Sequence, residues 1–144
     1  MHIDLTLNQK IFPEFYRDFA IFLFRQVKED IYSLANKKQQ NYKIRKMLLD
    51  QLGIVDKGIL ESLDLIQCVT NSIELNFNEG IYLIQLNPRK RIKGTNLKLK
   101  QLVRLLEFGT LTFPELPVIR RVFKKYQDGY EELFDDFIEE EFSV

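Results

Sequence analysis

Histidine and cysteine, the side chains that most often supply a base, a nucleophile or zinc ligands, occur only once each in this sequence. The imidazole belongs to His2 and the thiol to Cys68. One histidine and one cysteine cannot assemble a structural zinc site of the usual ligands, and a single cysteine cannot form an internal disulfide. A serine or cysteine nucleophile would also lack its usual histidine base. The sequence therefore offers no basis for nucleophilic or zinc-dependent chemistry.

Glycines and carboxylates likewise lack the spacing of a phosphate-binding or catalytic motif. The six glycines form neither a G-x-G-x-x-G pattern nor a P-loop. Neighbouring carboxylates do occur late in the sequence, at Asp135, Asp136, Glu139 and Glu140. They lie in a helical acidic run, which is typical of a solvated or partner-facing surface rather than of the environment that acid–base catalysis demands. We therefore expect a protein that is not an enzyme, with no catalytic residue, no cofactor and no metal.

Charge is distributed unevenly along the chain, although 21 basic and 21 acidic side chains give a formal net charge of zero. Residues 89–125 contain 11 basic and 2 acidic side chains, and residues 126–144 contain 8 acidic and no basic ones. A basic segment that is followed directly by an acidic one predicts complementary contacts between surfaces.

The basic segment opens with a loop, and Arg89, Lys90, Arg91 and Lys93 are the best candidates there for a functional surface. The basic residues Lys98, Lys100 and Arg104 follow in the sequence. Three interpretations remain open: a solvated loop, an interface with an acidic surface such as the C-terminal helix of a neighbouring copy, and a sequence-independent contact with DNA phosphates. No aromatic residue interleaves these charges, which argues against a platform that stacks single-stranded bases.

Length and composition favour one globular domain over residues 1–144. Apolar residues make up 45% of the chain and charged residues 29%, a balance that favours a folded core over disorder. The longest apolar run, residues 19–24, is flanked by Asp18 and Arg25 and is too short to cross a bilayer. No secretory signal pattern opens the sequence, so we expect folding in a reducing cytoplasm and no membrane partner.

The N-terminal part, residues 1–55, is expected to be helical. A helix is predicted from Pro13 to about Ala35, because apolar residues recur there at helical spacing. The main stripe consists of Phe15, Phe19, Leu23, Val27 and Ile31. This helix is interpreted either as a central core helix or as partly a subunit interface. Shorter helices are predicted over 42–52 and 56–69, so that three helices precede the first clear strand.

The pattern then changes to strict alternation, which predicts a β-hairpin from strands 72–77 and 81–86 with a turn at Asn78-Glu79-Gly80. A short helix is predicted from Leu99 to Gly109, and Pro117 is expected to open a long last helix that continues across Gly129. The expected fold class is α+β: a small antiparallel sheet with a central hairpin, flanked by a long N-terminal helix and a long C-terminal helix.

The most specific pattern in the sequence lies in residues 101–123. Residues 101–110 read QLVRLLEFGT, and after a short gap residues 114–123 read PELPVIRRVF. This pattern resembles the tail-completion, or head–tail neck, proteins of long-tailed phages that are related to the gene-ten product of a lambdoid phage. In that family an apolar helix ends in Glu-Phe-Gly-Thr, and a proline-containing loop leads into the last helix. The resemblance covers roughly residues 56–140, so residues 56–144 are taken as the tail-completion-like part.

The resemblance implies a structural virion protein that is made in the cytoplasm of a bacterial host. It would be a subunit of a ring, commonly sixfold, that joins the head connector to the tail tube or closes the tube. Its implied partners are further copies of itself and other neck, connector or tail-tube proteins, with passing DNA as a candidate contact without sequence specificity. The alternative is a small DNA-binding or host-interacting accessory protein that acts through the basic segment 89–104.

A closed ring needs two different complementary patches on each subunit. The basic segment 89–125 and the acidic segment 126–144 are our candidates for these patches. At the Glu-Phe-Gly corner we expect Gly109 to adopt a positive φ and Phe108 to pack inward. The full set of interface candidates is Arg89, Lys90, Arg91, Lys93, Glu107, Phe108, Gly109, Arg120, Arg121, Asp135, Asp136, Glu139 and Glu140.

Overall fold

A three-stranded antiparallel sheet with the strand order β1-β3-β2 organises the fold. The computed structural model describes residues 2–7, 13–38, 50, 53, 65–87, 89–91, 98–109, 115 and 117–142. Within them β1 spans His2–Leu5, β2 spans Ile73–Asn78 and β3 spans Ile81–Leu86. The predicted hairpin is confirmed, and both Glu79 (φ 52°) and Gly80 (φ 81°) occupy the left-handed region, as a two-residue hairpin turn requires.

The expectation that three helices precede the first strand is wrong. β1 lies at the start of the chain and pairs with the central strand β3, with Ile3 opposite Ile84 and Leu5 opposite Tyr82. The sequence does alternate at Ile3, Leu5 and Leu7, but this run is too short to establish a strand on its own. Burial of both Ile3 and Leu5 against the helices stabilises this short strand.

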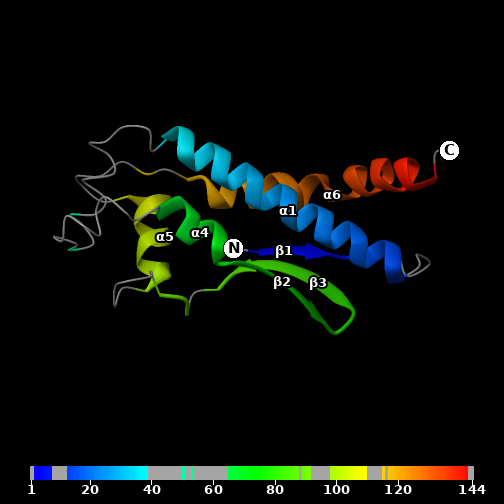
Figure 1. The fold of residues 1–144 in the computed structure, drawn as a ribbon, viewed down its shortest axis with the longest axis horizontal. Helices are drawn as coiled ribbons and strands as arrows, with labels where there is room; N and C mark the ends of the chain where they lie inside the picture. Colours follow the sequence, from blue (N-terminus) through cyan, green and yellow to red (C-terminus); the bar gives the residue numbers. More distant parts are fainter. Residues whose placement is uncertain are drawn as a thin grey trace.

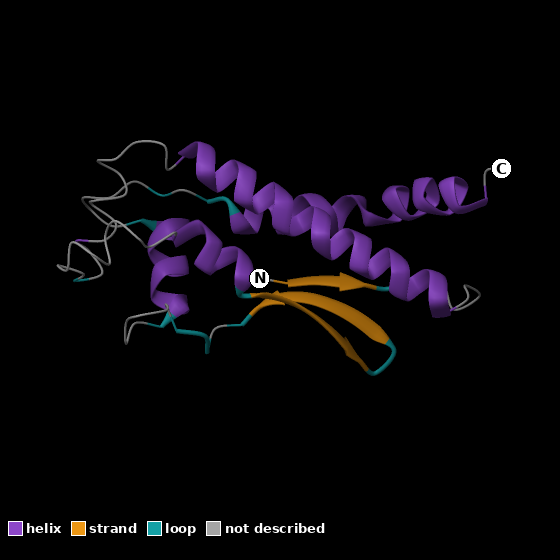
Figure 2. Ribbon diagram, viewed as in Figure 1, coloured by secondary structure: helices purple, strands orange, loops and turns teal. Residues whose placement is uncertain are grey.

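Four described helices accompany the sheet, and the expected α+β class with flanking N- and C-terminal helices is confirmed. They are α1 (Pro13–Lys38), α4 (Leu65–Asn71), α5 (Leu99–Phe108) and α6 (Ile119–Phe142). Figure 1 shows that the long helices α1 and α6 lie along one side of the sheet, whereas α5 stands at one end of it. Figure 2 shows the same separation of helices and strands. The helix predicted over 42–52 and the beginning of that over 56–69 lie almost entirely outside the described residues.

The apolar stripe of α1 lies at the centre of the core. Phe19, Leu23, Val27 and Ile31 are fully buried, and α1 contacts α6, α4 and both strands of the hairpin. This burial confirms that α1 is a core helix of its own subunit, as helical spacing of apolar residues predicts. Phe22 lies off the main stripe and keeps 38% of its surface exposed.

The outer edge of β1 is covered by side chains of α6. The Gln127 side-chain amide accepts a hydrogen bond from the Asp4 backbone N–H at 2.8 Å and donates one to the Asp4 carbonyl oxygen at 3.2 Å. The Tyr130 hydroxyl donates to the Thr6 carbonyl oxygen at 3.1 Å. These contacts satisfy backbone groups that an edge strand otherwise presents to other chains. They also hold the C-terminal helix against the N-terminal strand.

We expect Gln127→Ala to lower the free energy of unfolding by about 1–2 kcal/mol, because two backbone groups of Asp4 lose their partner. Urea denaturation of the variant measures this loss. Asp128→Ala is the matched control, since Asp128 is the exposed neighbour of Gln127 on the same helix, and it should change stability by less than about 0.5 kcal/mol. Equal effects of the two substitutions would contradict the role of Gln127.

Candidate interaction site

The corner between α5 and α6 is built around the carboxylate of Glu107, which is fully buried. Its Oε1 accepts a hydrogen bond from the backbone N–H of Ile119 at 2.6 Å, and its Oε2 accepts one from the N–H of Arg120 at 3.4 Å. The first N–H groups of a helix have no acceptor within the helix, and a negative charge is favoured at that end. A side chain from the last turn of α5 therefore caps the N-terminus of α6.

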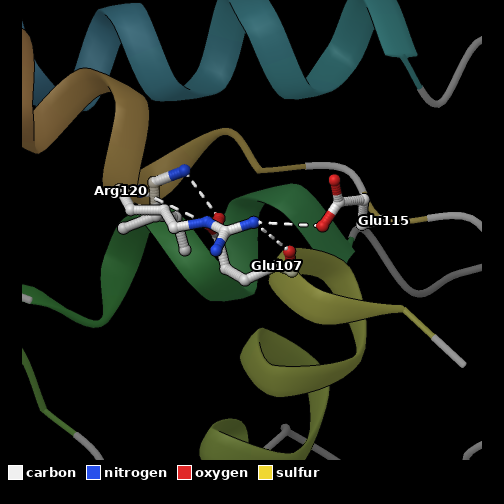
Figure 3. A network of polar contacts seen from close by, with 4 residues as sticks. Glu107, Glu115 and Arg120 are labelled. Atoms are coloured by element: carbon white, nitrogen blue, oxygen red, sulfur yellow. Dashed lines mark hydrogen bonds and ion pairs between the residues drawn. The ribbon is translucent and has the colours of Figure 1, made fainter.

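Arg120 closes the corner from the other side. Its Nη2 donates to the Glu107 carbonyl oxygen at 2.8 Å, and its Nε lies 3.3 Å from Glu107 Oε2. The same guanidinium lies 3.3 Å from a carboxylate oxygen of the exposed Glu115. Figure 3 shows these contacts joining the end of α5, the connection and the first turn of α6. The angle between the two helices is therefore fixed by a hydrogen-bonded ion pair and not by packing alone.

The two residues after Glu107 behave differently from each other. Gly109 has φ 67° and donates its N–H to the Leu105 carbonyl oxygen at 2.9 Å, so the prediction of a positive φ is confirmed. The prediction that Phe108 packs inward is wrong, because Phe108 is 59% exposed. Adjacent residues of a helix point about 100° apart, and Glu107 takes the inward position at this turn. The Phe108 ring instead lies against the guanidinium of Arg120, 4.7 Å from centroid to Cζ.

Burial raises the pKa of the Glu107 carboxyl above its ordinary value of 4.5. The hydrogen bonds from the backbone N–H groups of Ile119 and Arg120, and the positive charge of Arg120, act in the opposite direction without cancelling the effect of burial. The corner is thus held together by a carboxyl group whose protonation is coupled to folding.

A cavity of about 420 Å³ lies beside this corner, between α5 and the adjoining end of the sheet. Leu86, Leu99 and Val103 contribute apolar surface to it, and the exposed side chains of Lys100, Arg104 and Phe108 also line it. Helical spacing explains the contribution of α5, because residues 99 and 103, like 100 and 104, are one helical turn apart. We call this site the basic cavity.

The basic loop folds against the start of α5. Leu99 donates its N–H to the Lys90 carbonyl oxygen at 2.8 Å, and Arg91 forms an isolated β-bridge with Lys98. Arg89, Lys90 and Arg91 are exposed. The structure therefore gathers the described part of the loop and the basic residues of α5 at one end of the molecule. Lys93 lies outside the described residues.

The acidic candidates lie at the other end. Asp135, Asp136, Glu139 and Glu140 are exposed on the last turns of α6, and Figure 1 shows α5 and the C-terminus at opposite ends of the long axis. The structure thus joins Glu107, Phe108, Gly109 and Arg120 in one corner, but it separates the basic and acidic candidates. Arg121 is exposed on the first turn of α6.

Sequence reasoning missed two parts of the site, namely the capping of α6 by Glu107 and the apolar surface inside the basic cavity. The second had a signal in the sequence, because Leu99 and Val103 share the one-turn spacing of Lys100 and Arg104. The contribution of β1 and β3 to the cavity had no signal in the sequence, because it arises from tertiary packing.

The fold and the site together define the class of this protein. It is an α+β protein with a capped corner between two helices and with one basic and one acidic end. Comparisons with protein-family models, with curated proteins and with solved structures give no match. None of the described helices is long and apolar enough to cross a membrane. Within the described residues there is also no group of three or more His, Cys, Asp or Glu side chains placed to hold a metal ion.

Proposed function

We propose that this chain is a structural virion protein of a tailed phage, a tail-completion or head–tail joining subunit that forms a ring at the neck. The observation that carries the proposal is the α5–α6 corner. The two sequence stretches that resemble the neck family contribute Glu107, Phe108 and Gly109 on one side and Arg120 on the other, and these residues contact one another directly. The resemblance therefore rests on one physical unit and not on scattered matches.

The corner suits an architectural role. A ring closes only if each subunit holds its two interfaces at a constant angle. The buried Glu107 carboxylate and the Arg120 guanidinium fix α6 relative to α5, and the packing of α6 on α1 and β1 fixes it relative to the sheet. These contacts connect the two ends of the molecule through packed elements, which suits a repeated head-to-tail contact.

The alternative function is supported by one observation: the exposed residues Arg89, Lys90 and Arg91 are joined by backbone contacts to the start of α5, the helix that carries Lys100 and Arg104. Such a cluster suits phosphate groups, and a DNA-binding accessory protein would use it with strong salt dependence. It would not require the protein to form a ring.

Light scattering of the purified chain over a range of concentrations and salt tests the two functions against each other. We expect a discrete ring-sized oligomer, with a central opening in electron micrographs. A monomer or dimer that binds double-stranded DNA, with an affinity that falls steeply with salt, would contradict the ring and support the accessory function.

A further inference from the structure

We propose that the basic cavity binds the acidic end of α6 from a second copy of this chain. The acidic end is defined as the exposed side chains of Asp135, Asp136 and Glu139 together with the neighbouring Phe22 of α1. This inference rests on the proposed function, because it names the contact through which subunits of the ring would join.

The chemistry of the cavity indicates what it binds. Two exposed cations, Lys100 and Arg104, line the cavity together with the half-buried Leu86 and with the edges of the core residues Leu99 and Val103, which are 2% and 7% exposed. Phe108 adds a ring that is 59% exposed at the same place. A suitable occupant therefore carries several negative charges around an apolar side chain. The positive charges of the cavity would repel a basic surface.

The acidic end has this composition. Asp135, Asp136 and Glu139 belong to a segment with 8 acidic and no basic side chains. Phe22 is 38% exposed, and its ring centroid lies 5.5 Å from that of Phe137, which follows Asp136 directly. Phe22 therefore lies against the same turns of α6 that carry these carboxylates, and an exposed aromatic side chain among charges is a common anchor of protein interfaces.

The geometry requires that the occupant come from another copy. Figure 1 shows α5 and the C-terminal end of α6 at opposite ends of the long axis. The end of α6 cannot fold back, because Phe134 and Phe137 pack against Phe19 of α1, with ring centroids 5.0 and 5.6 Å apart. Contact between the cavity of one copy and the acidic end of the next is heterologous, so it extends from copy to copy until rotation closes a ring.

Charge reversal with rescue between two full-length variants tests the contact. The cavity variant carries Lys100→Glu and Arg104→Glu, and the end variant carries Asp135→Lys and Asp136→Lys. All four side chains are exposed, so both variants should unfold at the same denaturant concentration as the wild type, within error. Each variant alone should self-associate at least about tenfold more weakly than the wild type, because like charges then face each other.

An equimolar mixture of the two variants should associate again, since each reversed surface then meets its complement on the other chain. Analytical ultracentrifugation measures the mass of each sample relative to the 17.2 kDa chain. Arg25→Glu with Lys124→Glu is the matched control, because it reverses two exposed basic side chains away from the cavity. It should associate like the wild type.

The possible outcomes separate this contact from the proposed function. Rings of the wild type that persist in the cavity variant would overturn the contact and leave the ring intact. A mixture that associates only to a dimer would support the contact and contradict the ring. If neither the wild type nor the mixture associates, the contact is wrong.

Discussion

Replacement of Phe19 by alanine is expected to lower the free energy of unfolding by about 3–5 kcal/mol, the usual range for removing a buried phenylalanine. Phe19 is fully buried. Its ring makes an edge-on contact with Phe134 at 5.0 Å and a tilted contact with Phe137 at 5.6 Å. The substitution therefore removes apolar contacts from the interface of the two long helices and leaves a cavity there.

Urea denaturation followed by circular dichroism measures this loss. Phe77→Ala is the matched control, because it removes the same side chain from a position that is 62% exposed, at the tip of the hairpin. Phe77 still contacts Tyr82, with ring centroids 4.6 Å apart, so its loss should cost at most about 1 kcal/mol. Similar losses for the two variants would show that α1 and α6 do not share the core described here.

The sequence-based prediction succeeded where periodicity extended over many residues. The stripe through Phe19 and Ile31 predicted α1, and alternation on both sides of Gly80 predicted the hairpin. β1 was missed for a physical reason. Ile3, Leu5 and Leu7 do alternate in the sequence, but so short a run does not establish a strand, and its partner β3 lies about 80 residues away, so the pairing depends on tertiary packing.

The candidate site was likewise predicted only where its conformation is set by neighbouring residues in the sequence. The Glu-Phe-Gly stretch predicted a helix end with a positive φ at Gly109, because glycine adopts positive φ without steric cost. The cap of α6 was not predicted, because Glu107 lies 12 positions before Ile119. The sequence did contain a warning: residues 116–118 include no Ser, Thr, Asp or Asn before Ile119. A helix without a local cap needs an acceptor from elsewhere, although the sequence does not identify it.

The charge asymmetry was visible in the sequence, but its meaning depended on geometry. Adjacent basic and acidic segments suit a contact within one chain as well as a contact between copies. Because α6 is a single helix of 24 residues, it carries the acidic residues away from α5. The length of one uninterrupted helix thus argues against a contact between the two segments within one chain.

Glu107→Ala is expected to lower the free energy of unfolding by about 2–4 kcal/mol, because it leaves the N–H groups of Ile119 and Arg120 without their acceptor and removes the ion-pair partner of Arg120. Glu115→Ala is the control. It removes the other carboxylate partner of the same guanidinium, but Glu115 has a side chain that is 61% exposed, so its loss should cost less than about 1 kcal/mol. Denaturation of both variants with urea measures the difference.

The pH dependence of stability provides an independent test of the same carboxyl group. Its folded-state pKa is raised above 4.5, chiefly by burial, so the folded protein binds this proton more tightly than the unfolded chain does. The stability that the proton contributes is fully present below about pH 4.5 and is lost as the pH rises through the folded-state pKa. Glu107→Gln retains one amide oxygen as an acceptor but has no proton to release.

The stability of Glu107→Gln relative to the wild type should therefore increase from pH 4.5 towards neutrality, because only the wild type loses the contribution of this group. Other titrating groups affect both proteins alike and cancel in the difference. Arg120, the charged side chain that contacts Glu107, is the same in both proteins. A difference that does not change with pH would show that Glu107 is ionised in the fold as easily as in the unfolded chain. The hydrogen bonds to Glu107 and the positive charge of Arg120 would then offset the whole effect of burial on this carboxyl group.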